Sequence, residues 1–372
     1  MVGVSSEQDA DESLKDIQND EAKLEKEIKL PSAALGLALS ENDDFCHVTG
    51  MDRGVHQVNI DSGKTKRIGE HKSYAASIEL LPDRQTLISA GYDGHIIWHD
   101  LAKKNVHRNI KAHNFWSWQM KISADGSKLA SVTGQYICGG YKYEPAPETE
   151  PSVCVFDTKT GKSLAKFPHV PPVQSLAFSP DNRFLAAGNL MGEVRVWDLV
   201  KSEQVANWTT GAFTGWGIIK GHYYTGGIFD MFFSQKSKDI TLCGMGSTRD
   251  PAAGNGKQLW QKFDWQASPP KKLDESHSGE HGAGLMETLI QHPSGKYFVM
   301  AGRLFKGNWN VAFFDTTSGK LLHSFDCGMR CIKARFNAAG DKLFIAGAVS
   351  QKNDIKKKDK PNFGRIKIFT IT

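Results

Sequence analysis

Residues that could bind phosphate or activate a nucleophile occur in this chain, but not in the patterns that such chemistry needs. A phosphate-binding loop has the pattern GxxxxGK[ST]. The chain has Gly-Lys-Thr at 63–65 and Gly-Lys-Ser at 161–163, where Val58 and Phe156 occupy the place of the first glycine. GMGSTRD lacks the third glycine of a dinucleotide-binding loop, and the patterns HExxH and GxSxG do not occur. We therefore predict no catalytic residues, no cofactor and a protein that is not an enzyme.

The six cysteines, which could form disulfides or bind metal, are scattered without a CxxC pair. In a chain of this length that spacing does not indicate a disulfide framework. Cys327 and Cys331 have a CxxxC spacing, and two further ligands would have to converge on them to make a metal site. We predict reduced and mostly buried thiols, with one of this pair in a turn and the other on a strand, and no metal.

Charge is distributed unevenly along the chain. Residues 1–29 hold nine carboxylates and four lysines, a net charge of −5, so the remainder carries +10 of the total of +5. A basic body can attract nucleic acid or another polyanion, which we keep as an alternative function. The sequence contains no apolar run of membrane-spanning length and its start is unlike a secretory signal. We predict a cytoplasmic protein without a membrane anchor.

Seven similar units, at spacings of about 40 to 58 residues, must position any site in this chain. Each has a polar turn, a short apolar run such as RFLAAG, and an alternating strand such as VRVWD or VAFFD; in several units a Gly-Lys turn leads to one more strand. The period-2 alternation predicts four short strands a unit. One such sheet cannot bury both of its faces, but seven sheets in a ring can.

At GNLMGEVRVWDL, residues 188–199, the chain resembles the WD-repeat propeller family. Gly192, Val194, Val196, Trp197 and Asp198 match the third-strand signature of that family, and His169 matches the start of the repeat. The resemblance covers roughly residues 30–372 and implies an all-β, seven-bladed propeller of four-stranded antiparallel blades. It also implies that an N-terminal strand completes the last blade, so we predict that residues 27–30 pair with residues 365–371.

The N-terminal segment and the propeller make two predicted regions. Residues 1–26 form an acidic segment, helical or disordered, and residues 27–372 form the propeller. A helical pattern extends over residues 6–28, with Ser6 as a cap and Leu14, Ile17, Leu24 and Ile28 near one stripe.

Some repeats of the resembling family join their strands by a network of His, Ser, Asp and Trp. The second unit has His71, Ser89 and Asp93, with His99 in the Trp position. The fourth has His169 and Trp197, but Ala187 and Met191 replace Ser and Asp. We expect neither network to be complete, so that stability depends more on packing than on buried polar bonds.

Long connections between the second and third strands are predicted to project from one face, at residues 133–152, 244–257, 302–310 and 347–364. Aromatic and arginine side chains dominate binding hot spots. We therefore predict partner-binding residues on these loops at Tyr141, Tyr143, Arg249 and Trp309.

The stretch HNFWSWQM adds aromatic candidates at the mouth of the channel. Aligned on His71, His113 and His169, it places Met120 and Ile122 in the core and Trp118 in the channel or between blades. The predicted mouth residues are Tyr74, Phe115, Trp116, Trp118 and Arg330. An aromatic group would then face a cation across the mouth.

These patterns favour a non-enzymatic scaffold that presents its long-loop face and channel mouth to a protein or peptide partner. A propeller enzyme or cofactor-binding protein similar to quinoproteins is the second hypothesis, although the docking tryptophans of that family are absent from this chain. Binding of a polyanion by the basic body is the third. The partner and the oligomeric state stay open.

Overall fold

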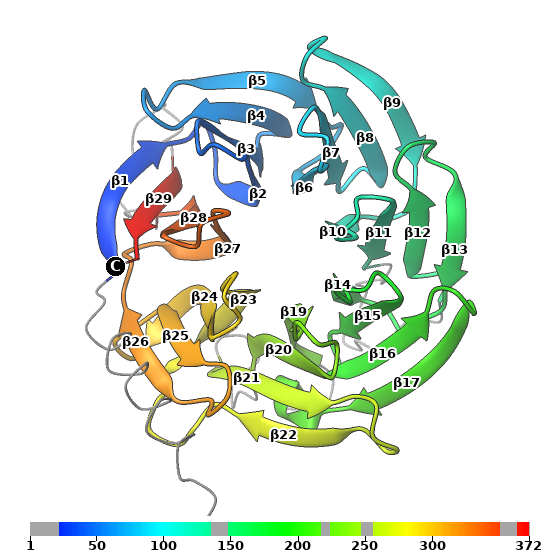
Figure 1. Cartoon of the computed structure of the whole chain (residues 1–372), viewed down its shortest axis with the longest axis vertical. Helices are drawn as coiled ribbons and strands as arrows, with labels where there is room; N and C mark the ends of the chain where they lie inside the picture. Colours follow the sequence, from blue (N-terminus) through cyan, green and yellow to red (C-terminus); the bar gives the residue numbers. More distant parts are fainter. Residues whose placement is uncertain (1–21, 135–147, 217–223, 247–255, 350–362, 372) are drawn as a thin grey trace, which may run out of the picture.

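The computed structural model describes residues 22–134, 148–216, 224–246, 256–349 and 363–371. Within these ranges the chain is almost entirely β-strand, with one short 3-10 helix at Gly211–Phe213. The strands form seven blades around a central channel (Figure 1). The predicted all-β propeller is thus confirmed. No helix within the described ranges is long and apolar enough to cross a membrane.

Blades 1 to 4 are separate four-stranded antiparallel sheets. Blade 1 contains β2 (Ala34–Leu39), β3 (Phe45–Gly50), β4 (Gly54–Asn59) and β5 (Thr65–Glu70). Blade 2 contains β6 (Ala75–Leu80), β7 (Thr86–Gly91), β8 (His95–Asp100) and β9 (Asn105–Lys111). Blade 3 contains β10 (Ser117–Ile122), β11 (Lys128–Thr133), β12 (Val153–Asp157) and β13 (Ser163–Phe167). Blade 4 contains β14 (Val173–Phe178), β15 (Phe184–Asn189), β16 (Glu193–Asp198) and β17 (Glu203–Thr209).

Blades 5 and 6 share a two-residue bridge between β21 and β23. Blade 5 contains β19 (Tyr224–Phe233), β20 (Asp239–Met245), β21 (Gly256–Asp264) and β22 (Lys271–Glu275), and β18 (Thr214–Trp216) extends its inner edge. Blade 6 contains β23 (Ala283–Gln291), β24 (Tyr297–Lys306), β25 (Val311–Asp315) and β26 (Leu321–Phe325). Because β24 continues to Lys306, the predicted long loop at 302–310 is wrong: only residues 307–310 connect it to β25.

Blade 7 joins the two ends of the described chain. It contains β27 (Arg330–Phe336), β28 (Lys342–Ala348), β29 (Gly364–Thr370) and β1 (Lys23–Lys29). The pairs Glu27↔Lys367 and Lys29↔Arg365 confirm the predicted ring closure. The predicted helix is wrong over residues 23–28, because pairing with the open edge of β29 overrides the weak helical stripe. Residues 6–21 of that predicted helix lie outside the described residues.

A turn with left-handed backbone follows the innermost strand of every blade. Seven residues hold a φ between 55° and 82° at this point, namely Asp43, Arg84, Gly126, Asn182, Ser237, Gly295 and Gly340. Asn, Asp and Gly are the residues that tolerate this conformation best. The predicted polar turns of the seven units therefore share one geometry, which reverses the chain between the first and second strands.

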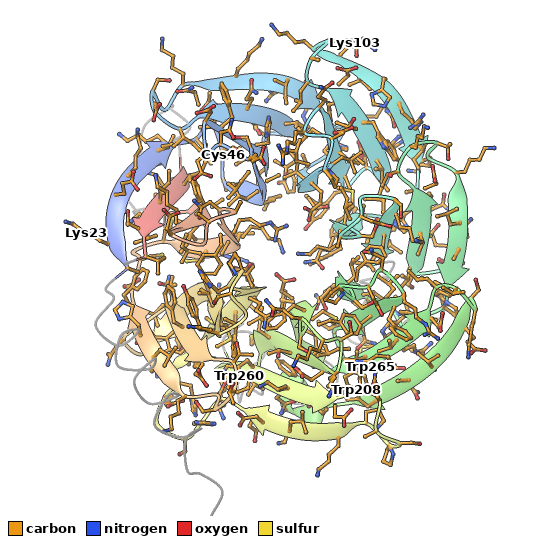
Figure 2. The ribbon with its side chains drawn as sticks, in the orientation of Figure 1. Lys23, Cys46, Lys103, Trp208, Trp260 and Trp265 are labelled. Carbon is orange, nitrogen blue, oxygen red and sulfur yellow. The ribbon has the colours of Figure 1, made fainter. Side chains whose placement is uncertain are left out.

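The apolar core is divided among the spaces between neighbouring blades. Trp197 of blade 4 stacks on Phe167 of blade 3, with ring centroids 5.2 Å apart. Trp98 of blade 2 donates its indole N–H to the carbonyl of Thr158 in blade 3 at 2.8 Å. Figure 2 shows Trp260 and Trp265 in the lower part of the ring, where both side chains are buried. Full burial of one such side chain contributes about 3 kcal/mol, so the ring is held by many similar contacts.

Candidate functional site

A β-bulge interrupts the innermost strand of every blade at the same point, four residues before the end of the strand. The bulges lie between Ala34 and Gly36, Ala75 and Ser77, Ser117 and Gln119, Val173 and Ser175, Ile228 and Asp230, Met286 and Thr288, and Cys331 and Lys333. A bulge leaves one residue unpaired and redirects its side chain. The seven unpaired residues, which we call the bulge ring, are Leu35, Ala76, Trp118, Gln174, Phe229, Glu287 and Ile332.

All seven residues of the bulge ring line one cavity at the mouth of the channel, with a volume of about 350 Å³. Pockets for small ligands or single side chains begin near this size, at roughly 300 Å³. Tyr74, Tyr92, Met51 and Arg330 add to its walls. The ring therefore builds a site to which each blade contributes one residue.

Five aromatic residues of blades 2 and 3 form one side of the mouth, which we call the aromatic wall: Tyr74, Tyr92, Phe115, Trp116 and Trp118. Trp116 stacks between Tyr92 and Phe115, with centroid distances of 4.6 and 4.7 Å. Trp118 lies 5.8 Å from Tyr92, and Tyr74 lies 5.9 Å from Tyr92. Tyr74 is 40% exposed. The wall is thus held by ring-to-ring contacts and still offers surface to a ligand.

Two local features position the segment that carries this wall. The buried His113 bonds through Nε2 to the hydroxyl of Ser131 at 2.8 Å, and burial lowers the pKa of His113 to about 3. The backbone of residues 113–115 crosses over Gly94, where an added Cβ would lie 2.2 Å from the carbonyl oxygen of His113. Gly94, with φ of 74°, is therefore required for this path of the backbone, which carries Phe115 and Trp116 into the aromatic wall.

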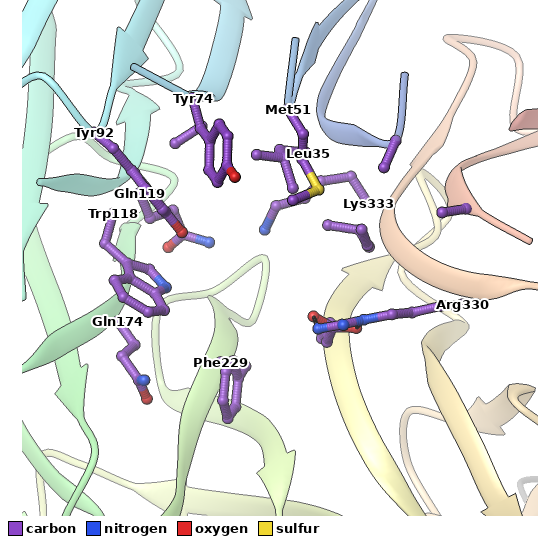
Figure 3. A pocket seen from close by; sticks show the side chains of 15 residues that line it. Leu35, Met51, Tyr74, Tyr92, Trp118, Gln119, Gln174, Phe229, Arg330 and Lys333 are labelled. Carbon is purple, nitrogen blue, oxygen red and sulfur yellow. Dashed lines mark hydrogen bonds and ion pairs between the residues drawn. The ribbon is translucent and has the colours of Figure 1, made fainter. Parts of the chain in front are cut away.

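Arg330 faces the aromatic wall across the cavity (Figure 3). Its Nε and Nη2 donate to the carboxylate of Glu287 at 2.6 and 2.7 Å. This bidentate bond raises the pKa of Arg330. The predicted arrangement of an aromatic group opposite a cation is present at the mouth.

A polar tier lies directly beneath the bulge ring. Asp230 is fully buried and lies 3.8 Å from Nζ of Lys121 and 3.7 Å from Nζ of Lys333. It also accepts bonds from Gln119 Nε2 at 3.3 Å and from the Leu289 N–H at 3.2 Å. Burial alone would raise the pKa of Asp230, but the charges of Lys121 and Lys333, with the Leu289 N–H and Arg335, outweigh burial and lower the pKa. Burial lowers the pKa of Lys121 to about 8. We call Lys121, Asp230 and Lys333 the channel triad.

A second ion pair lies in the channel beside this triad. Arg335 donates Nη2 to Glu79 at 2.8 Å, which joins blade 7 to blade 2. The carboxylates of the channel thus form ion pairs with cations from other blades.

The structure places the other predicted binding residues differently. Trp309 is only 5% exposed, and its indole N–H donates to the carbonyl of Glu280 at 3.1 Å. It packs with Phe314 in the core of blades 5 and 6, so its prediction as a surface anchor is wrong. Tyr141, Tyr143 and Arg249 lie outside the described residues. Phe115 and Trp116 belong to the aromatic wall but lie behind the residues that line the cavity.

The structural repeat residues differ between blades 2 and 4. His71 bonds to Asp93 at 3.1 Å and to Ser89 at 2.9 Å, and Ser89 bonds to His99 at 2.9 Å. The network of blade 2 is therefore complete, and the prediction that it is not is wrong: His99 takes the role of the tryptophan.

Blade 4 lacks this network, as predicted. His169 donates Nε2–H to the carbonyl of Ala187 at 3.2 Å, and its ring lies edge-on to the buried Trp197, 6.0 Å away. Asp198 is bound by Arg183 at 2.8 Å. The His169 contacts fasten the second and third strands to the start of the blade, and the Arg183–Asp198 pair joins those two strands at their other end.

The core and cysteine predictions are also tested. Met120 is buried in the core, and Ile122 packs against the same cluster. Trp118 both lines the cavity and packs against the core of blades 3 and 4. Five cysteines are free and buried, with Cys331 on β27 and Cys327 in the preceding turn; Cys138 lies outside the described residues. Within the described ranges, no three His, Cys, Asp or Glu residues converge to hold a metal.

Sequence reasoning missed six residues of the bulge ring and one residue of the wall, namely Leu35, Ala76, Gln174, Phe229, Glu287, Ile332 and Tyr92. The alignment on the three histidines already pairs Trp118 with Ala76 and Gln174. Extending that alignment through all seven units would have found the whole ring, whereas the bulge itself leaves no local sequence signal.

Seven four-stranded blades around a channel, each adding one residue to its mouth, define the molecule as a β-propeller. The model of the family described as "WD domain, G-beta repeat" matches residues 161–198, from the turn before β13 to the end of β16. WD repeat-containing protein SL1-17 of Schistosoma mansoni is 23% identical over 152 residues, which cover 41% of this chain and 46% of that protein. The predicted resemblance to WD-repeat propellers is thereby confirmed. WD-repeat proteins generally act as scaffolds for protein interactions.

Proposed function

We propose that this protein is a non-enzymatic interaction scaffold that holds a protein or peptide partner at the mouth of its channel. The observation that carries the proposal is the cavity formed by the bulge ring and bordered by the aromatic wall. Tyr74 and Met51 at its rim are 40% and 44% exposed. Aromatic and arginine side chains in such a concave setting dominate binding energies. Tyr141, Tyr143 and Arg249, which lie outside the described residues, stay further candidates from the sequence.

The ionisable groups described at the mouth favour binding over catalysis. Glu287 is engaged by Arg330 through two hydrogen bonds, and Asp230 lies between two lysines. A general acid or base needs a poised pKa and an unshared proton site. These groups instead stabilise one another, which supports a scaffold. We also propose a cytoplasmic location, on the strength of the family resemblance.

The proposal is tested by covalent capture in extract followed by mass spectrometry. The full chain is compared with the double variant Tyr74→Ala/Met51→Ala, which trims two exposed residues of the mouth. The control is Leu164→Ala/Val205→Ala, because Leu164 and Val205 are 52% and 41% exposed on β13 and β17 at the outer rim. Partners recovered with the wild type and the control should be depleted about tenfold or more with the mouth variant. Equal recovery from all three proteins would contradict the proposal.

A further inference from the structure

The charged pairs of the channel share an asymmetry in exposure. At the mouth, the Arg330 side chain is 43% exposed and its partner Glu287 only 10%. In the channel triad, Lys121 and Lys333 are 18% and 14% exposed, and Asp230 is 0% exposed. Since the carboxylates lie behind the cations, a group that enters the channel meets positive charge first.

The net charge of these groups is also positive. The four cations are Lys121, Arg330, Lys333 and Arg335, and the three anions are Glu79, Asp230 and Glu287. One positive charge is left over. Burying an anion beside this excess is favourable, because the surroundings screen charges less than bulk water does. The mouth is therefore electrostatically complementary to a carboxylate.

The cavity walls define the rest of the occupant. Trp118, Phe229 and Leu35 present apolar surface from three blades, and Arg330 approaches from the opposite side (Figure 3). We propose that the mouth binds an acidic peptide segment, with one large apolar side chain among these residues and a carboxylate beside Arg330 and Lys333. This proposal rests on the proposed function and adds the chemistry of the partner.

Nucleic acid fits the same site less well. Base stacking needs free aromatic faces, but Tyr92, which lines the cavity, is already stacked with Trp116 and Trp118. Arg330 and Lys333 each have a carboxylate neighbour, at 2.6 and 3.7 Å, so the mouth carries one excess charge instead of a basic track. A peptide needs only a single matched anion.

The test measures the binding of three blocked dipeptides to the full chain by ligand-observed NMR: acetyl-Phe-Glu-amide, acetyl-Phe-Gln-amide and acetyl-Phe-Lys-amide. The acidic probe should bind about tenfold more tightly than its neutral isostere, which is the usual size of one charge-assisted contact. A short oligothymidylate is the fourth probe.

Two double variants locate the effect. Arg330→Gln/Glu287→Gln removes the ion pair at the mouth without changing the net charge, and the preference for the acidic probe should fall to about twofold or less. Arg84→Gln/Glu41→Gln removes an exposed ion pair in the turns after β2 and β6, and the preference should be unchanged. Melting temperatures of both variants show that they are folded.

Three outcomes would overturn the inference. Equal or tighter binding of the Gln or Lys probe, lost in Tyr74→Ala/Met51→Ala, would keep the scaffold and discard the acidic partner. Tighter binding of oligothymidylate would assign the mouth to nucleic acid. Absence of binding by all four probes would also overturn it, whereas the capture experiment decides the proposed function separately.

Discussion

The bulge ring and the polar tier beneath it are built from adjacent residues of the same strands, yet they behave differently. Trp118 and Phe229 present apolar surface to the cavity, whereas the next residues, Gln119 and Asp230, are buried and bonded to each other, although Gln119 also lines the cavity. The bulge separates the two, because it turns one side chain of each strand out of the ladder. The side chains of the polar tier bond to one another across blades, whereas the mouth retains surface for a partner.

This contrast extends to what holds each region. The polar tier and the strand networks depend on the charge state of buried groups, such as the channel triad and the histidines. The mouth depends on ring contacts among Tyr74, Tyr92 and Trp118. The loss of stability should therefore be largest in acid, smaller on removal of a buried charge and smallest on removal of an exposed ring.

Acid should produce the largest effect, through histidines that burial keeps neutral. Burial lowers the pKa from 6.5 to about 4 for His47 and His99, and to about 3 for His113 and His169. Because the folded pKa lies below the unfolded value, stability is complete above pH 6.5 and decreases as the pH falls towards these values. Each histidine contributes a loss of about 1.4 kcal/mol per pH unit in that window.

Urea unfolding between pH 7 and pH 4.5 measures this slope. In the variant His113→Gln, the free energy of unfolding should change less steeply with pH, by the contribution of about one proton, because glutamine does not titrate. Its side chain can still bond to Ser131. A free energy of unfolding that stays level across this window would show that the interior does not depend on neutral histidines, and would remove this part of the contrast.

Removing the charge of Asp230 should have the second largest effect. Asp230→Asn preserves the shape but leaves Lys121 and Lys333 in the channel without their carboxylate. Breaking a buried charge pair typically costs about 3 to 5 kcal/mol. Urea unfolding at pH 7 measures the loss, and Glu41→Gln, which breaks an exposed pair with Arg84, should cost under about 1 kcal/mol. Equal losses would mean that the triad does not hold the tier together.

The fold was predictable because the repeat appears seven times and the same four-stranded pattern explains every copy. Strand alternation and the turn after each innermost strand are local signals, and the unpaired edge of the last unit required a strand near residue 27. The strand β1 starts at Lys23 because its partner β29 extends to Thr370, and only tertiary pairing carries that information.

The site was predictable in part. Trp118 was predicted from its position after His113, and Arg330 from the equivalent position in the last repeat, because equivalent positions recur in every repeat. Trp309 was misplaced because an aromatic residue near a turn can face the core as well as solvent, and its burial depends on the bond to Glu280. His99 completed the network of blade 2 because an imidazole can reach Ser89 as an indole does, which residue type alone does not show.

Removing an exposed ring of the mouth should have the smallest effect on stability and sharpens the comparison most. Tyr74 precedes β6, is 40% exposed and, among the residues that the structure describes, has one ring neighbour, Tyr92, at 5.9 Å. Tyr74→Ala forfeits that contact and part of one buried face, so the free energy of unfolding should fall by under about 1 kcal/mol. Met120→Ala, four residues into β10 and 1% exposed, is the matched core variant and should cost about 2 to 5 kcal/mol. Urea unfolding at pH 7, where the histidines of the interior stay neutral, isolates the two losses. If Tyr74→Ala lowers the free energy of unfolding as much as Met120→Ala does, the aromatic wall is part of the structural core. The distinction between a mouth that binds a partner and an interior whose groups bond to one another would then fail.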